Sequence, residues 1–102
     1  MTREEKIKKI ARTYGYDAQS RQCVEEMAEL TQAINKFWRK RLKCGNVQIN
    51  DVPPDTDEEI NLEEELADVQ IMIWQLKYLC GMSDMEFERK IDKKLNRQLS
   101  RM

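Results

Sequence analysis

Histidine is absent from the 102 residues of this chain, and that absence excludes several kinds of active site. It rules out histidine-based catalytic triads, most catalytic zinc sites, and the di-iron helical bundles that need a Glu-x-x-His pair. Glycine is scarce as well: the three glycines, Gly15, Gly45 and Gly81, all fall where helices are expected to end. Without a Gly-rich loop, a phosphate ligand is expected to be held through a metal rather than through backbone amides.

The chain also has few cysteines, and its net charge is close to zero. Cys23, Cys44 and Cys80 form an odd set without the spacing of a metal site, and the stretch MTREEKIKKI lacks the apolar core of a signal peptide. These features predict a reduced, cytoplasmic protein. No apolar run approaches the ~20 residues that span a bilayer, so no membrane partner is expected. The 18 basic residues nearly balance the 19 acidic ones, which gives no reason to expect nucleic-acid binding.

Helix start and stop signals are frequent in the first half of the chain. Thr2 and Glu5 form a capping box that opens a short first helix, and Gly15 is its expected end. A long second helix is predicted to begin within residues 17–20 and to run to Gly45. Lys and Arg are concentrated in its last turns, as the helix dipole favours.

The second half of the chain contains similar helix start and stop signals, which follow a polar segment. Residues 46–59 contain both prolines of the chain and are predicted to form a loop. A capping box at Asn61 then opens a third helix that Gly81 ends, and Ser83 with Glu86 opens a fourth. No strand alternation or internal repeat is present. The prediction is a single all-α domain over residues 1–102, with four helices in a long antiparallel bundle completed by oligomerisation.

Two carboxylates of the predicted third helix lie among apolar side chains. Each helical residue advances about 100° around the axis, which places Glu65 and Asp68 in the same sector as Met72 and Leu79. A second apolar stripe follows the other side, so this helix is expected to be buried on most sides. On the predicted second helix, the glutamates form a patch that begins at the edge of the apolar arc; its members are Glu26, Glu29 and Glu25, in order of distance from that arc.

These carboxylates require a partner of opposite charge. Like charges one helical turn apart repel each other, and converging carboxylates would have raised pKa values unless a cation stabilised them. Oxygen ligands without His or Cys suit a hard ion, so Mg²⁺ is the first choice and Mn²⁺ the substitute. Because Mg²⁺ commonly binds substrate phosphates as well, the metal implies a phosphate ligand.

The acidic motifs resemble those of a known family. EEMAE at residues 25–29 and EELAD at residues 64–68 resemble the EExxE and ExxD motifs of the all-α nucleoside triphosphate pyrophosphohydrolases, in particular the MazG-like branch. The resemblance covers most of residues 21–101. Proteins of this family hydrolyse nucleoside triphosphates with Mg²⁺ to the monophosphate and pyrophosphate, and they are obligate dimers or tetramers. The resemblance implies the same activity, cofactor and homo-oligomeric state here.

The resemblance also assigns roles to the carboxylates. Glu26, Glu29, Glu65 and Asp68 match the inner metal ligands of the family. Glu25 and Glu26 are the catalytic candidates that hold the attacking water, with Glu25 as the outer ligand or general base because it is the most exposed on the helical wheel. A metal-bound water deprotonated by a carboxylate would attack the phosphorus.

The last helix carries the remaining candidates. Its stretch KIDKKLNRQLSR resembles the basic element of the family, so Lys94 and Arg97 would steady the phosphates. Gln98 stands where some relatives carry a second arginine, and read without the resemblance both cations are equally compatible with ordinary surface charge. Trp38 and Trp74 are expected to be core or interface residues. Two alternatives stay open: a non-catalytic helical interaction protein and a nucleotide-binding regulator without turnover.

Overall fold

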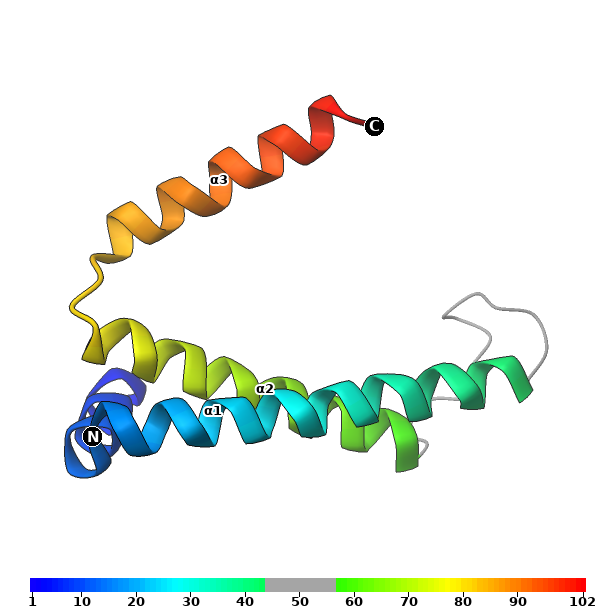
Figure 1. The fold of residues 1–102 in the computed structure, drawn as a ribbon, viewed down its shortest axis with the longest axis horizontal. Coiled ribbons are helices and arrows are strands. Elements are labelled where there is room, and N and C mark those ends of the chain that lie inside the picture. The colour runs from blue at the N-terminus through cyan, green and yellow to red at the C-terminus, as the bar shows by residue number, and fades with distance from the viewer. Residues whose placement is uncertain (44–56) are drawn as a thin grey trace.

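The chain folds into three helices in the computed structural model, which describes residues 1–43 and 57–102. Helix α1 spans Arg3–Lys43, α2 spans Asp57–Leu79 and α3 spans Asp84–Ser100, as Figure 1 shows. The described ranges contain no strand, which confirms the all-α class. None of the described helices is long and apolar enough to cross a membrane. The predicted helix end at Gly45 and residues 46–56 of the predicted loop lie outside the described residues.

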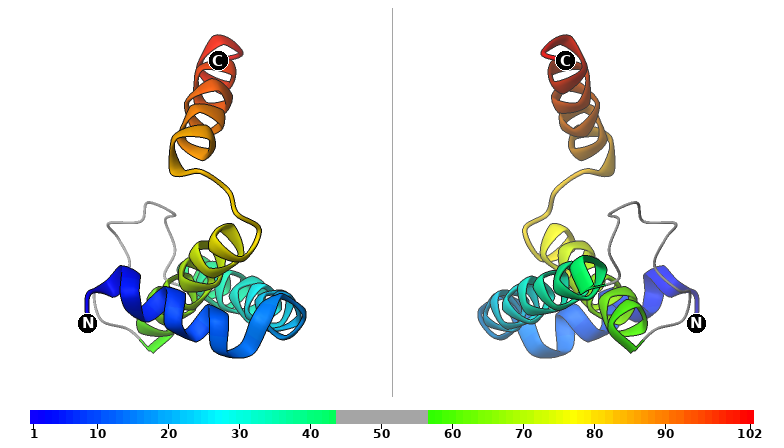
Figure 2. Two further views of the ribbon diagram at one scale, coloured as in Figure 1. Left: turned by 90° about the vertical axis from the view of Figure 1, so that its left-hand side faces the viewer. Right: turned by 90° about the vertical axis from the view of Figure 1, so that its right-hand side faces the viewer.

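The structure has three helices rather than the predicted four, because α1 includes the predicted first helix and the predicted second helix. Gly15 is non-helical, with φ 81° and ψ 171°, and α1 consists of two helical segments that meet at a kink at this residue. The predicted interruption at Gly15 is therefore present. The segment before Gly15 crosses the α1–α2 pair, as Figure 2 shows. Its start is as predicted: the Glu5 amide donates to Thr2 Oγ1 at 3.1 Å.

Gly15→Ala is expected to destabilise the protein through backbone strain alone. The φ and ψ of Gly15 lie in a region that is essentially restricted to glycine, while an added Cβ would meet nothing within 4 Å. The expected loss is about 1–3 kcal/mol in the free energy of unfolding, measured by urea titration. Gly81→Ala is the matched control, because its φ of 67° belongs to the less costly left-handed helical region. Equal stability of wild type and Gly15→Ala would show that the bend is not fixed by glycine.

Helices α1 and α2 lie side by side in antiparallel orientation and provide the core (Figure 1). Near one end of the pair, Gln19 Nε2 donates to Gln75 Oε1 at 2.7 Å, and both side chains are buried. Small side chains allow the close approach of the helices, and larger ones fill the remaining space. The buried apolar side chains are Ala11, Cys23, Ala33, Phe37, Val69 and Met72.

Each helix of the pair covers only one side of its neighbour, so the expectation that α2 is buried on most sides is wrong for the single chain. Only Val69, Met72 and Gln75 of α2 are buried. Leu66 and Ile73 are 50% and 36% exposed. On α1 a second set of large apolar side chains is about half exposed, namely Val24, Met27, Ile34 and Trp38. A large part of the apolar surface therefore lacks a partner within the described chain.

Helix α3 leaves the end of α2 through a well-defined junction. The Met82 amide donates to the Lys77 carbonyl at 3.0 Å, with Gly81 at positive φ, so α2 ends where the sequence predicts. Ser83 Oγ accepts from the Glu86 amide at 3.1 Å, which confirms the predicted helix start. Lys77 Nζ pairs with Asp84 Oδ1 at 3.1 Å across the junction.

Beyond the junction, α3 is directed away from the α1–α2 pair, as Figures 1 and 2 show. No residue of α3 is buried, and its apolar side chains Ile91, Leu95 and Leu99 are exposed. The start of α2 also differs from the prediction: helix begins at Asp57 rather than at Asn61. Three acidic residues in the first turn favour this earlier start, because negative charge stabilises a helix N-terminus.

Candidate metal site

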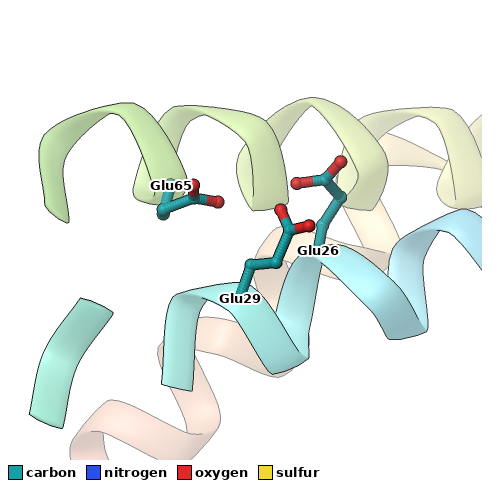
Figure 3. Close-up of side chains that lie close together, drawn as sticks. All are labelled: Glu26, Glu29 and Glu65. Carbon is teal, nitrogen blue, oxygen red and sulfur yellow. The ribbon is translucent and has the colours of Figure 1, made fainter. Parts of the chain in front are cut away.

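Three glutamates from the two core helices converge on one point. Glu26 and Glu29 lie one turn apart on α1, and Glu65 faces them from α2, as Figure 3 shows. One carboxylate oxygen of each residue lies within 4.8 Å of the others. The antiparallel packing brings these residues together although 36 positions separate Glu29 from Glu65 in the sequence.

The hydrogen bonding of these glutamates is incomplete. Glu26 Oε1 accepts from Gln22 Nε2 at 2.8 Å. The second oxygens, Glu26 Oε2 and Glu65 Oε2, are buried and have no hydrogen-bond partner in the described part of the chain. Buried polar atoms are normally paired, because an unpaired one loses its hydration without compensation. A bound cation would supply the missing partner for both oxygens.

The electrostatics of the cluster favour the same conclusion. The negative charge of Glu26 raises the pKa of Glu29, and the charge of Glu65 raises it further. Asp68 also contributes to this shift, so its charge acts on the cluster. A cation bound at this point would remove the repulsion that Glu29 experiences from its neighbours. The donors are all oxygen atoms, which fits Mg²⁺ or Mn²⁺.

The structure places the other two predicted carboxylates at the margin of the cluster. Asp68 is exposed, not buried among apolar side chains as the helical wheel predicted, because α1 covers the Val69 and Met72 side of α2. Glu25 is exposed, as predicted. Neither residue belongs to the group of three converging oxygens.

The predicted phosphate-binding pair lies elsewhere in the chain. Lys94 and Arg97 belong to α3, where they line an exposed hollow of about 250 Å³ together with Lys90 and Lys93. Because α3 is directed away from α1 and α2, these cations are not brought to the carboxylates of the same chain (Figure 1). Of the two tryptophans expected in the core or at an interface, Trp74 is half-buried and Trp38 is 54% exposed.

A second basic group on α1 was not predicted from the sequence. Lys36, Arg39 and Lys40 line a hollow of about 220 Å³ with Glu58 of α2. The spacing contains a signal for it, since Lys36 and Lys40 follow Glu29 by seven and eleven residues. At about 100° per residue, these positions lie within about 20° of Glu29 around the helix.

No protein-family model matches the chain, and no curated protein or solved structure is significantly similar to it. The functional interpretation therefore depends on the site and on the motifs that compose it.

Replacing Glu29 by glutamine is expected to stabilise the metal-free protein and to remove its stabilisation by Mg²⁺. The variant relieves repulsion from Glu26 and Glu65, and an increase of about 1–4 °C in Tm is expected from the typical size of such repulsions. Thermal unfolding with Mg²⁺ and with EDTA measures both effects. Glu63→Gln, an exposed acid outside the cluster, is the control and should retain the Mg²⁺ effect.

The raised pKa of Glu29 fixes the direction of the pH dependence. Protonated Glu29 avoids the repulsion, so its contribution to stability is fully present below its ordinary pKa and is lost as the pH rises through the raised value. The metal-free wild type should therefore lose stability over this pH range, and Glu29→Gln should lose less. A wild type that gains stability over the same range, relative to Glu29→Gln, would contradict the assigned repulsion.

Proposed function

We propose that this protein is a Mg²⁺-dependent nucleoside triphosphate pyrophosphohydrolase, which cleaves between the α and β phosphates and releases the monophosphate and pyrophosphate. The single observation that supports the proposal best is the cluster of Glu26, Glu29 and Glu65, two of whose oxygens are buried without a hydrogen-bond partner among the residues that the structure describes. A solvated acidic surface would not contain such atoms. The acidic motifs supply the choice of reaction, through their resemblance to the MazG-like family.

In the proposed reaction, the acidic residues of α1 and α2 have different roles. Glu26, Glu29 and Glu65 hold the metal, and Asp68, whose charge already acts on Glu29, completes the ligand set. When bound, the metal supplies positive charge for the phosphates and lowers the pKa of a coordinated water. Glu25 accepts the proton of the attacking water, because it is solvent-exposed beside Glu26. Glu26 helps to orient that water. Mn²⁺ substitutes for Mg²⁺ at such an all-oxygen site.

We also propose that the protein forms a homo-oligomer, either a dimer or a tetramer. Val24, Met27, Ile34 and Trp38 follow one another along α1 at spacings of three, seven and four residues, which keep them on one side of the helix. Leu66 and Ile73 continue the apolar surface on α2. Such spacing is typical of helices that pack in bundles. A second copy that covers these faces would complete a four-helix core.

Oligomerisation also offers a role for α3. Its exposed stripe of Ile91, Leu95 and Leu99 requires an apolar surface, and the junction at Gly81 directs the helix away from its own chain. Packing of α3 on another subunit would bury this stripe. Lys94 and Arg97 keep the proposed phosphate contact if α3 reaches the carboxylates of that subunit.

The experiment that tests the function is a product analysis with nucleoside triphosphates, Mg²⁺ and EDTA. Monophosphate and pyrophosphate formed only with Mg²⁺ would support the proposal. Diphosphate and phosphate as products would contradict it, because they arise from cleavage at a different phosphoanhydride bond.

A further inference from the structure

The hollow between Lys36, Arg39 and Lys40 contains more positive than negative charge. Three cations and the single carboxylate of Glu58 line it, and Lys40 is half-buried. No ion pair within 4.0 Å joins these three cations to another residue in the described ranges. Because one carboxylate cannot neutralise three cations, the hollow keeps an excess of positive charge, and an anion bound there would be favoured.

The helix dipole does not account for this arrangement. Cations are stabilised near a helix C-terminus, but the effect is limited to about the last turn. Helix α1 ends at Lys43, whereas Lys36 lies about two turns earlier. The dipole also has no preference for one side of the helix. Lys36 and Lys40 nevertheless lie on the side of α1 that carries Glu29.

The distance between the hollow and the carboxylates suits an extended anion. Lys36 follows Glu29 by seven residues, which is about 10 Å along the helix axis. On the antiparallel α2, Glu58 precedes Glu65 by the same number of residues. The hollow and the glutamate cluster are therefore neighbouring positions along one seam between the two helices.

We infer that Lys36, Arg39 and Lys40 bind the distal phosphates of a polyphosphate chain whose metal-bound end lies at the glutamate cluster. This inference rests on the proposed function, since it takes the glutamates as the metal site. Lysine donates to phosphate as a point charge, and arginine donates through a planar fork to two oxygens. A ligand with a single phosphate cannot occupy both positions, so the hollow selects triphosphates over monophosphates and holds the pyrophosphate part of the substrate.

The chain provides a matched control for this site. Lys6 and Lys9 are exposed cations of the segment before Gly15, and they line neither the hollow at Lys36 nor the one on α3. The variants Lys36→Gln/Lys40→Gln and Lys6→Gln/Lys9→Gln therefore remove the same number of charges, but only the first removes them from the hollow beside the proposed metal site.

Inorganic tripolyphosphate is the probe, and its affinity is measured by titration calorimetry on the oligomeric protein with Mg²⁺ at ~0.15 M salt, where long-range attraction is screened. Loss of two charge-assisted contacts should weaken binding at least about tenfold in Lys36→Gln/Lys40→Gln. The control double variant should stay within about twofold of the wild type. Circular dichroism establishes that both variants retain their helices.

The outcomes separate this inference from the proposed function. Equal losses in the two double variants, or no loss in Lys36→Gln/Lys40→Gln, would overturn the assignment of the hollow, whether or not the protein is an enzyme. Selective loss in a protein that does not hydrolyse nucleoside triphosphates would uphold the polyphosphate site and remove the catalytic proposal. Affinity for inorganic phosphate equal to that for tripolyphosphate would also contradict the inference, because it requires two occupied positions.

Discussion

Glu29→Gln is expected to abolish pyrophosphate release from nucleoside triphosphates while the helices remain intact. Glu29 is the central member of the cluster, because the charges of Glu26, Glu65 and Asp68 all act on it. A neutral amide at this position removes a proposed metal ligand without changing the shape of the side chain. Loss of a supporting residue at a metal site typically costs 10–100-fold in activity, so loss of a ligand should cost at least about 100-fold.

Asp68→Asn tests the same site from the other helix. Asp68 is exposed in the single chain and lies outside the group of three converging oxygens, so its role as a ligand depends on a rotation of its side chain toward the metal. Initial rates at saturating Mg²⁺, with helicity measured in parallel, compare both variants with the control Glu63→Gln. Full activity of both Glu29→Gln and Asp68→Asn would remove the proposed site.

The two alternative functions give different results in the same set of measurements. A non-catalytic interaction protein would show no stabilisation by Mg²⁺ in the wild type. A nucleotide-binding regulator would be stabilised by Mg²⁺ and nucleotide but would release no pyrophosphate. Glu26 and Glu65 each have a buried oxygen that lacks a hydrogen-bond partner within residues 1–43 and 57–102, which favours a metal site in either the enzyme or the regulator.

Ile34→Glu is expected to prevent the proposed oligomerisation and to leave a monomer or an unfolded chain. Ile34 is 48% exposed in the centre of the apolar face of α1, between Met27 and Trp38. A charge buried there without a partner would cost more than a dimer of small helices can supply. Light scattering should give a multiple of 12.2 kDa for the wild type and a smaller mass for the variant.

Gln32→Glu is the control for this experiment. Gln32 is exposed on α1, and two residues of helix separate its direction from that of Ile34 by about 200°. The control introduces the same charge on the polar side and should leave the mass unchanged. A monomeric wild type, or a stable oligomer of Ile34→Glu, would contradict the assignment of the apolar face as the subunit interface.

Local sequence signals predicted several ends of helices because the responsible contacts are themselves local. The hydroxyl of Thr2 and that of Ser83 each accept from a backbone amide three residues later. Gly81 adopts the positive φ that ends α2, and Gly15 adopts the non-helical φ and ψ that divide α1 into two segments. The capping box at Asn61 did not predict the start of α2, because the acidic residues before it extend the helix to Asp57.

Contacts between helices were predicted less completely. The helical wheel placed Glu65 on the side that packs against α1, and the structure brings it together with Glu26 and Glu29. It did not predict that Asp68 is exposed, because a wheel shows which side is apolar but not how much of that side the neighbouring helix covers. Lys36 was missed because it was read as part of a basic helix end rather than by its spacing from Glu29.

Pyrophosphate release from a panel of canonical and modified nucleoside triphosphates, each assayed with Mg²⁺ and with EDTA, tests the proposed activity most directly. We expect monophosphate and pyrophosphate to form in equal amounts with Mg²⁺, and EDTA to abolish their formation. No turnover on any triphosphate, in a preparation shown to be folded and oligomeric, would contradict the proposed function.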